Sequence, residues 1–116
     1  MSTAHWILAV PLALFYLYAG ALKVLRSPDR LRPMMAWVDR VPLPALRTLG
    51  VLELLGALGL LVPDALAPWP APAAAAGLVL LQLGAIPVHL TGGDRRIGLN
   101  LALLVAAAAA LWLSVA

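Results

Sequence analysis

Long apolar runs alternate with short polar connections along this chain. Four runs match the roughly 20 apolar residues that a helix needs to cross a bilayer core about 30 Å thick. They cover about residues 4–25, 44–62, 70–90 and 97–116. The pattern predicts an all-α integral membrane protein, a four-helix bundle that forms a single transmembrane domain over residues 1–116.

The first connection, residues 27–42, has a different pattern. Its apolar positions follow the i, i+3, i+4 and i+7 spacing of one helix face. These positions are Leu31, Met34, Met35 and Val38. The spacing predicts a short amphipathic helix in the membrane interface, with Trp37 at the level of the lipid headgroups. Two interpretations stay open: the segment is an anchor that ties the first two spans together, or it is a lid or docking surface.

Composition supports a membrane protein. The chain has 116 residues, of which 64% are hydrophobic and 11% are charged, whereas soluble domains carry about 25% charged residues. It has no cysteine, which excludes iron–sulfur ligation and thiol–disulfide exchange by this chain. The sequence has no phosphate-binding loop or dinucleotide fingerprint, and no spacing of His, Asp or Glu that suggests a metal site.

Basic residues gather at two of the three connections. Six lie in or beside the first connection, and Arg95 and Arg96 lie in the third, where Asp94 is predicted to cap the last helix. The second connection, residues 63–71, contains Asp64 and no basic residue. The positive-inside rule then places the first and third connections in the cytoplasm and both termini outside. The net charge of +3 follows from this anchoring, so we expect no nucleic-acid binding.

Glu53 lies in the middle of the second apolar span, where a carboxylate costs on the order of 2.5–3.5 kcal/mol. Counting ~1.5 Å per residue places it at nearly the same depth as Gln82 in the third span. The strongly polar side chains of the spans, apart from those at the outer ends, fall in the cytoplasmic half. The candidate ligand-binding or proton-binding residues are Glu53, Gln82, His89, Asn100, Lys23 and Tyr18. The sequence assigns a catalytic role to none of them.

Two interpretations of this polar set stay open. It is either a polar knot, meaning a cluster of buried polar side chains that only fixes the register of the helices, or a pocket for a proton, an ion or a small ligand. Lys23 fits an anchor at the interface, and it also fits a partner for Glu53 or for a ligand. His89 fits an interfacial residue or a proton relay. Gly50 and Ala57 share a helix face with Glu53, so a neighbouring helix can approach closely there.

Several of these residues stand in motifs that occur together in a known family. Gly20-Ala-Leu-Lys23 closes the first span, Gly50-Val-Leu-Glu-Leu-Leu-Gly-Ala-Leu-Gly-Leu-Leu-Val-Pro63 fills the second, and His89 and Asn100 follow. In this ordered set the chain resembles the DoxX-like membrane proteins over nearly its whole length. The resemblance implies a four-helix protein of the bacterial cytoplasmic membrane with Lys23, Glu53, His89 and Asn100 as its polar positions.

The resemblance also implies a role, because some members of that family are linked to quinone-coupled sulfur oxidation or to membrane-associated oxidoreductase complexes. We therefore expect a subunit or accessory of a quinone-linked redox system, which is non-catalytic alone or associated with an oxidoreductase. It would bring no intrinsic cofactor and would bind a quinone or a lipid. Its expected partners are the lipid bilayer, a membrane or cytoplasmic oxidoreductase and further copies of itself.

Two other functions remain open at this point. The first is a small proton-coupled transporter that uses Glu53. The chain shares its length and single membrane glutamate with small multidrug exporters, but those place the glutamate in the first span, where this chain has none. The second is a structural or assembly protein of the membrane, in which the polar set only holds the bundle together.

Overall fold

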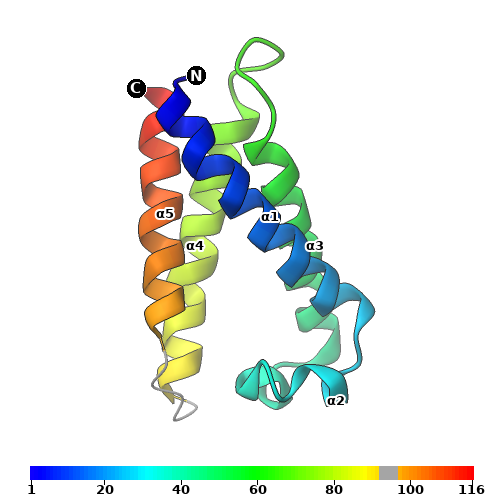
Figure 1. The fold of residues 1–116 in the computed structure, drawn as a ribbon. Coiled ribbons are helices and arrows are strands. Elements are labelled where there is room, and N and C mark those ends of the chain that lie inside the picture. Colours follow the sequence, from blue (N-terminus) through cyan, green and yellow to red (C-terminus); the bar gives the residue numbers. More distant parts are fainter. Residues whose placement is uncertain (92–96) are drawn as a thin grey trace.

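Four long helices make up most of the computed structural model, which describes residues 1–91 and 97–116, without the side chains of residues 36 and 37 (Figure 1). Their bounds are α1 (Thr3–Leu25), α3 (Leu43–Leu60), α4 (Pro70–Thr91) and α5 (Gly98–Val115). Each is long and apolar enough to cross a membrane. The predicted all-α membrane bundle is confirmed. The predictions for Trp37, Asp94, Arg95 and Arg96 fall on residues or side chains outside the described part.

Local interactions explain where α1 begins and ends. The Ser2 hydroxyl accepts a hydrogen bond from the backbone N–H of His5 at 3.1 Å, which caps the first turn. At the other end, one nitrogen of the Arg47 guanidinium donates to the carbonyl oxygens of Lys23 and Arg26, both at 2.6 Å. These bonds satisfy carbonyls that a helix end leaves unpaired and bring a positive charge to its negative pole. Because Arg47 belongs to α3, they also tie the end of α1 to α3.

The predicted amphipathic segment forms two short helical pieces rather than one continuous helix. They are α2 (Pro28–Leu31) and the 3₁₀ helix η1 (Ala36–Arg40). Pro33 has no backbone N–H to continue the α-helical ladder. The N–H groups of Met34 and Met35 instead both donate to the Leu31 carbonyl, at 2.9 and 2.7 Å. The chain therefore turns between the two pieces.

The α2–η1 segment packs against the bundle. A small apolar cluster joins it to α1 and α3, with buried members Leu22, Leu31, Val38 and Leu46. Within the segment, Arg32 donates to both carboxylate oxygens of Asp39, at 2.6 and 2.9 Å. These hydrogen bonds to the guanidinium hold the pKa of Asp39 below its usual value. The apolar face predicted from the spacing thus directs Leu31 and Val38 into the protein.

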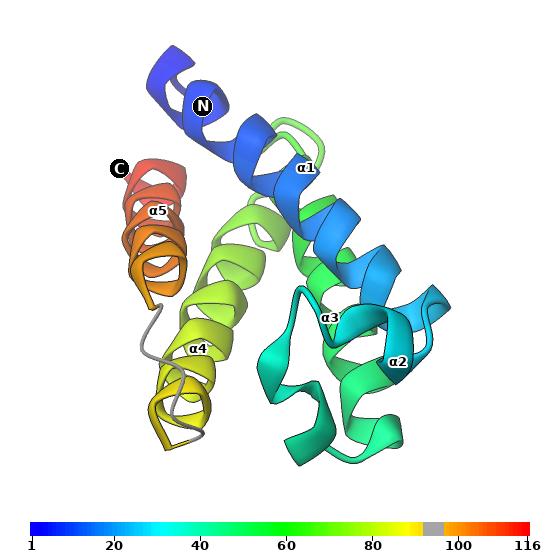
Figure 2. The ribbon, with the colours of Figure 1, turned by 60° about the horizontal axis from the view of Figure 1, so that its bottom comes forward.

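The long helices form two pairs, α1 with α3 and α4 with α5, which are joined by contacts between α3 and α4 and between α1 and α5. Both termini lie at one end of the bundle, and the α2–η1 segment lies at the other, which we call the α2–η1 end (Figure 1). The two pairs diverge toward the α2–η1 end, as the view onto that end shows (Figure 2). The main apolar core includes Leu12, Tyr16, Leu60, Leu78 and Ala107.

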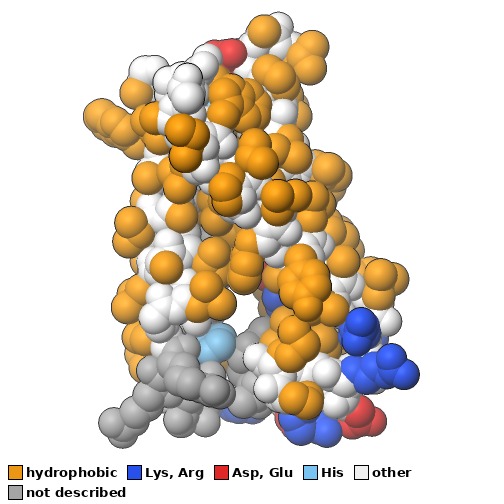
Figure 3. All heavy atoms as spheres, in the orientation of Figure 1, with side chains coloured by type: hydrophobic (Ala, Val, Ile, Leu, Met, Phe, Trp, Pro, Cys, Tyr) orange, Lys and Arg blue, Asp and Glu red, His pale blue; other side chains and the backbone are white. Residues whose placement is uncertain are grey.

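Large apolar side chains cover the outside of the helices, while Lys and Arg gather at the α2–η1 end (Figure 3). Ile7, Leu55 and Trp112 are 70%, 61% and 71% exposed. A soluble monomer rarely exposes so much contiguous apolar surface. The lipid bilayer is the environment that suits these faces, in agreement with the four apolar helices.

Two glycines set the distance between α1 and α3. A Cβ atom on Gly20 would lie 2.7 Å from the carbonyl oxygen of Gly50, and one on Gly50 would lie 2.8 Å from that of Gly20. Any larger residue would force the two backbones apart. A Cβ on Gly50 would also come within 2.9 Å of the Lys23 Cβ, and one on Gly20 within 3.2 Å of the Glu53 Cβ. The small residues predicted a close helix approach beside Glu53, and the crossing brings Lys23 and Glu53 together.

Candidate functional site

The candidate site begins with a buried ion pair between α1 and α3. The Lys23 ammonium donates to both carboxylate oxygens of Glu53, at 3.0 and 2.9 Å. The two side chains are only 8% and 10% exposed. A buried charge is tolerated when a partner of opposite sign and good hydrogen-bond geometry offset the loss of water. Of the roles considered for Lys23, the structure thus shows pairing with Glu53.

A chain of hydrogen bonds links the other pair of helices to α1. The side-chain amide of Gln82 on α4 donates to the Tyr16 hydroxyl at 2.7 Å. The side-chain amide of Asn100 on α5 donates to the Gln82 carbonyl oxygen at 3.0 Å. Tyr16 and Gln82 are buried, and Asn100 is half-buried. The network therefore joins three helices through uncharged groups.

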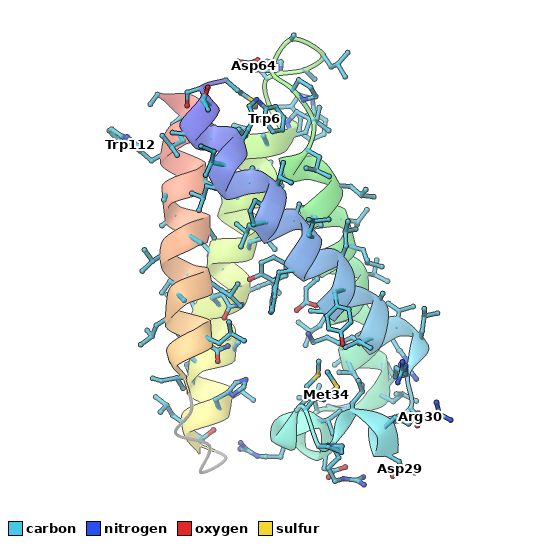
Figure 4. All side chains as sticks on the ribbon, viewed as in Figure 1. Trp6, Asp29, Arg30, Met34, Asp64 and Trp112 are labelled. Atoms are coloured by element: carbon cyan, nitrogen blue, oxygen red, sulfur yellow. The ribbon has the colours of Figure 1, made fainter. Side chains whose placement is uncertain are left out.

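Both networks border one cavity of about 260 Å³. Its lining includes all six candidate residues from the sequence, namely Lys23, Tyr18, Glu53, Gln82, His89 and Asn100. The surface is visibly hollowed between the helix pairs at the α2–η1 end (Figure 3). Met34 and Met35 contribute to the lining from the α2–η1 segment, and Met34 points toward the space between the pairs (Figure 4). The structure thus gathers residues of four long helices and the connecting segment around one space.

The fixed charges that line the cavity cancel. Among its described lining residues, only Lys23 and Glu53 carry a fixed charge, and they are paired with each other. The rest of the polar lining consists of hydroxyl, amide and imidazole groups, which both donate and accept hydrogen bonds. Apolar residues, including Phe15, Leu22 and Leu103, complete the walls. Such a space suits a neutral group with hydrogen-bonding atoms and an apolar body.

Arg40 connects the two sides of the structure at the α2–η1 end. One nitrogen of its guanidinium donates to the Val88 carbonyl oxygen at 2.7 Å, and the other donates to the Thr91 hydroxyl at 3.2 Å. Arg40 ends η1, whereas Val88 and Thr91 belong to the last turn of α4. The α2–η1 segment therefore reaches from the α1–α3 pair, on which it packs, to the end of α4.

Sequence reasoning missed Tyr16 and chose Tyr18 instead. Tyr16 is 1% exposed and bonded to Gln82, whereas Tyr18 lines the cavity with 60% of its surface exposed. A helical signal was present, because Tyr16 precedes Lys23 by seven residues and so shares its face. Depth alone had not separated the two tyrosines.

One family model matches nearly the whole chain. The model of the DoxX-like family matches residues 7–112, a range that contains every residue lining the cavity. The comparisons with curated proteins and with solved structures give no match.

The ion pair predicts that removing one partner is worse than removing both. Lys23→Met deprives the buried carboxylate of this ammonium, and Glu53→Gln deprives the buried ammonium of this carboxylate, so each should lower the free energy of unfolding by about 3–5 kcal/mol. The double variant Lys23→Met/Glu53→Gln removes both charges and should recover most of that loss. Reversible unfolding in mixed micelles measures all three variants.

The control is the exposed pair of Arg32 and Asp39, whose side chains are 48% and 52% exposed. The matched double variant Arg32→Met/Asp39→Asn, like either of its single variants, should change the stability little. If the losses from Lys23→Met and Glu53→Gln simply add in the double variant, the two residues are not coupled as described.

Proposed function

Because the chain belongs to the DoxX-like family, we propose that it is a membrane subunit of a quinone-linked redox system and binds the quinone headgroup in the cavity between its helix pairs. The observation that carries this proposal is the gathering of charge-balanced polar side chains around one space of about 260 Å³. That volume lies just below the ~300–1,000 Å³ of typical ligand pockets, and so suits a small headgroup.

The chemistry of the lining supports a quinone-like headgroup. The carbonyl oxygens of a quinone accept hydrogen bonds, and the hydroxyl groups of the quinol both donate and accept them. Gln82, Asn100 and His89 offer donors and acceptors for both redox states. Phe15 and the leucines of the wall provide apolar contact for the ring.

The charge balance favours a neutral headgroup over a phosphate. A phosphate binds best where cations are available to it. Lys23 is engaged by Glu53, and the guanidinium groups of Arg40 and Arg47 donate to backbone carbonyls and to Thr91. A phospholipid headgroup would therefore compete with contacts that already hold the helices together.

In this proposal an oxidoreductase partner, in the membrane or the cytoplasm, supplies the electrons. Reduction of the bound quinone consumes two electrons from the partner and two protons, and yields the quinol. The cavity binds and orients the quinone, and His89 lies in its lining. The chain itself contributes binding and orientation rather than a redox centre.

The two alternative functions fit these observations less well. A proton carrier at Glu53 would have to give up two hydrogen bonds to Lys23 in each transport cycle. A polar knot that only fixed the packing would leave no reason for an adjoining space of about 260 Å³, since protein interiors are close-packed. Proton-driven export from proteoliposomes that is lost in Glu53→Gln would favour the transporter over the proposal.

The ligand proposal predicts that a cavity variant binds a tailed quinone more weakly. Asn100→Leu removes an amide from the lining and the hydrogen bond to Gln82, so it should weaken binding of a decyl-substituted benzoquinone about fivefold to tenfold, equivalent to about 1–1.4 kcal/mol. Titration of the protein in lipid nanodiscs measures the affinity, and native mass spectrometry of gently solubilised protein identifies any quinone that is retained.

The control for this prediction is Ala108→Leu, because Ala108 is exposed on α5 and lines no part of the cavity. It should bind the quinone as the unsubstituted protein does. Failure of the unsubstituted protein to bind the quinone, or equal affinity in Asn100→Leu, would contradict the proposal.

We also propose that the chain lies in the bacterial cytoplasmic membrane with the α2–η1 end in the cytoplasm and both termini outside. Since the chain has no cysteine, single introduced cysteines report this orientation directly. In intact spheroplasts, a membrane-impermeant maleimide should label Ala65→Cys at the opposite end, whereas Ser27→Cys should react only after permeabilisation. The reverse pattern would overturn the orientation.

A further inference from the structure

A second space of about 790 Å³ runs along the outside of the bundle between α3 and α4. Trp69 and Pro70 line one end, and Val88 and His89 line the other, so it follows nearly the whole of α4, roughly 30 Å at 1.5 Å per residue. Between Trp69 and His89 its lining is aliphatic or glycine. We call it the α3–α4 groove.

The groove meets the polar cavity at the α2–η1 end. Leu49, Leu81, Ala85 and His89 line both spaces. The boundary between them is therefore made of single side chains, three of which are apolar. The polar groups of the cavity therefore lie next to the aliphatic surface of the groove.

We propose that the α3–α4 groove holds the hydrocarbon tail of the same molecule whose headgroup occupies the cavity, which makes the ligand a single-tailed amphiphile with a neutral head. This inference rests on the proposed function and adds the tail site to it. The groove follows the long axis of α4, as a lipid tail does in a bilayer, and its length is close to the thickness of the hydrocarbon core. The boundary that it shares with the polar cavity favours the tail over a second copy of this chain.

Two glycines of α4 allow the groove to be filled without disturbing the headgroup site. Gly77 and Gly84 line the groove and not the cavity. A Cβ atom on either would meet no other group within 4 Å. A leucine at these positions would therefore start from open space and extend its side chain into the groove, and replacing a glycine within a helix also favours helix formation.

The two positions also test how far along the groove the tail extends. Gly84 is next to Ala85 at the boundary with the cavity, whereas Gly77 is seven residues, about 10 Å, farther along α4. Gly84→Leu should weaken binding of benzoquinones with a pentyl or a decyl tail about fivefold. Gly77→Leu should weaken only the decyl compound by a similar factor. Neither should change the affinity for the tailless benzoquinone.

The experiment titrates the three benzoquinones into the protein in lipid nanodiscs, with empty nanodiscs to subtract partition into lipid. Ala108→Leu adds the same side chain to an exposed position of α5 outside both spaces and should leave all three affinities unchanged. Unchanged binding of the tailless compound also shows that each variant is folded.

The outcomes separate the two proposals. If the unsubstituted protein binds none of the three compounds, the proposed function fails. If it binds them and both glycine variants behave like the unsubstituted protein, the headgroup site stands and the tail site is wrong. If Gly77→Leu changes the number of chains in native mass spectra without any effect of tail length, the groove is an interface between copies and the tail site is wrong.

Discussion

The arrangement of this bundle depends on one constraint: a lysine and a glutamate buried among apolar helices must stay in contact. Burial deprives both charges of most of their hydration, and each offsets that loss by its interaction with the other. The contact is available because Gly20 and Gly50 let the backbones of α1 and α3 approach closely. Arg47 adds a second tie at the end of α1. Together these contacts hold α1 against α3.

The cavity results from the way in which the α4–α5 pair is joined to the α1–α3 pair. Gln82 and Asn100 link α4 and α5 to Tyr16 by hydrogen bonds, and the helix pairs diverge toward the α2–η1 end (Figure 1). Arg40 joins them again at the α2–η1 end. The space left between these two links is lined by paired charges and neutral polar groups, and it borders an apolar groove. This gradation from polar to apolar is what a membrane amphiphile requires of a site.

The helices and the depth of their polar residues could be predicted from the sequence, whereas several side-chain contacts could not. Long apolar runs fix helix bounds because a bilayer sets their length, and depth counting placed Glu53 level with Gln82. Depth does not give direction around the helix. It therefore could not decide whether Lys23 contacts Glu53 or lies at the interface, and it could not separate Tyr16 from Tyr18. The amphipathic spacing of residues 27–42 did not reveal that Pro33 would divide the segment. The boundary that the cavity shares with the α3–α4 groove depends on tertiary packing, which no local pattern encodes.

The central claim is that Lys23 and Glu53 form a persistent buried ion pair and leave the neutral groups of the cavity to the ligand. They are the only lysine and the only glutamate of the chain, so cell-free expression with ¹⁵N-lysine and ¹³C-glutamate labels one pair of side chains. Solid-state NMR in liposomes then measures the dipolar coupling between the Lys23 Nζ and the Glu53 carboxyl carbon. We predict a strong coupling, with the shifts of an ammonium and a carboxylate, that persists when the decyl benzoquinone is added. A coupling that is absent, or that disappears when the quinone binds, would contradict the claim.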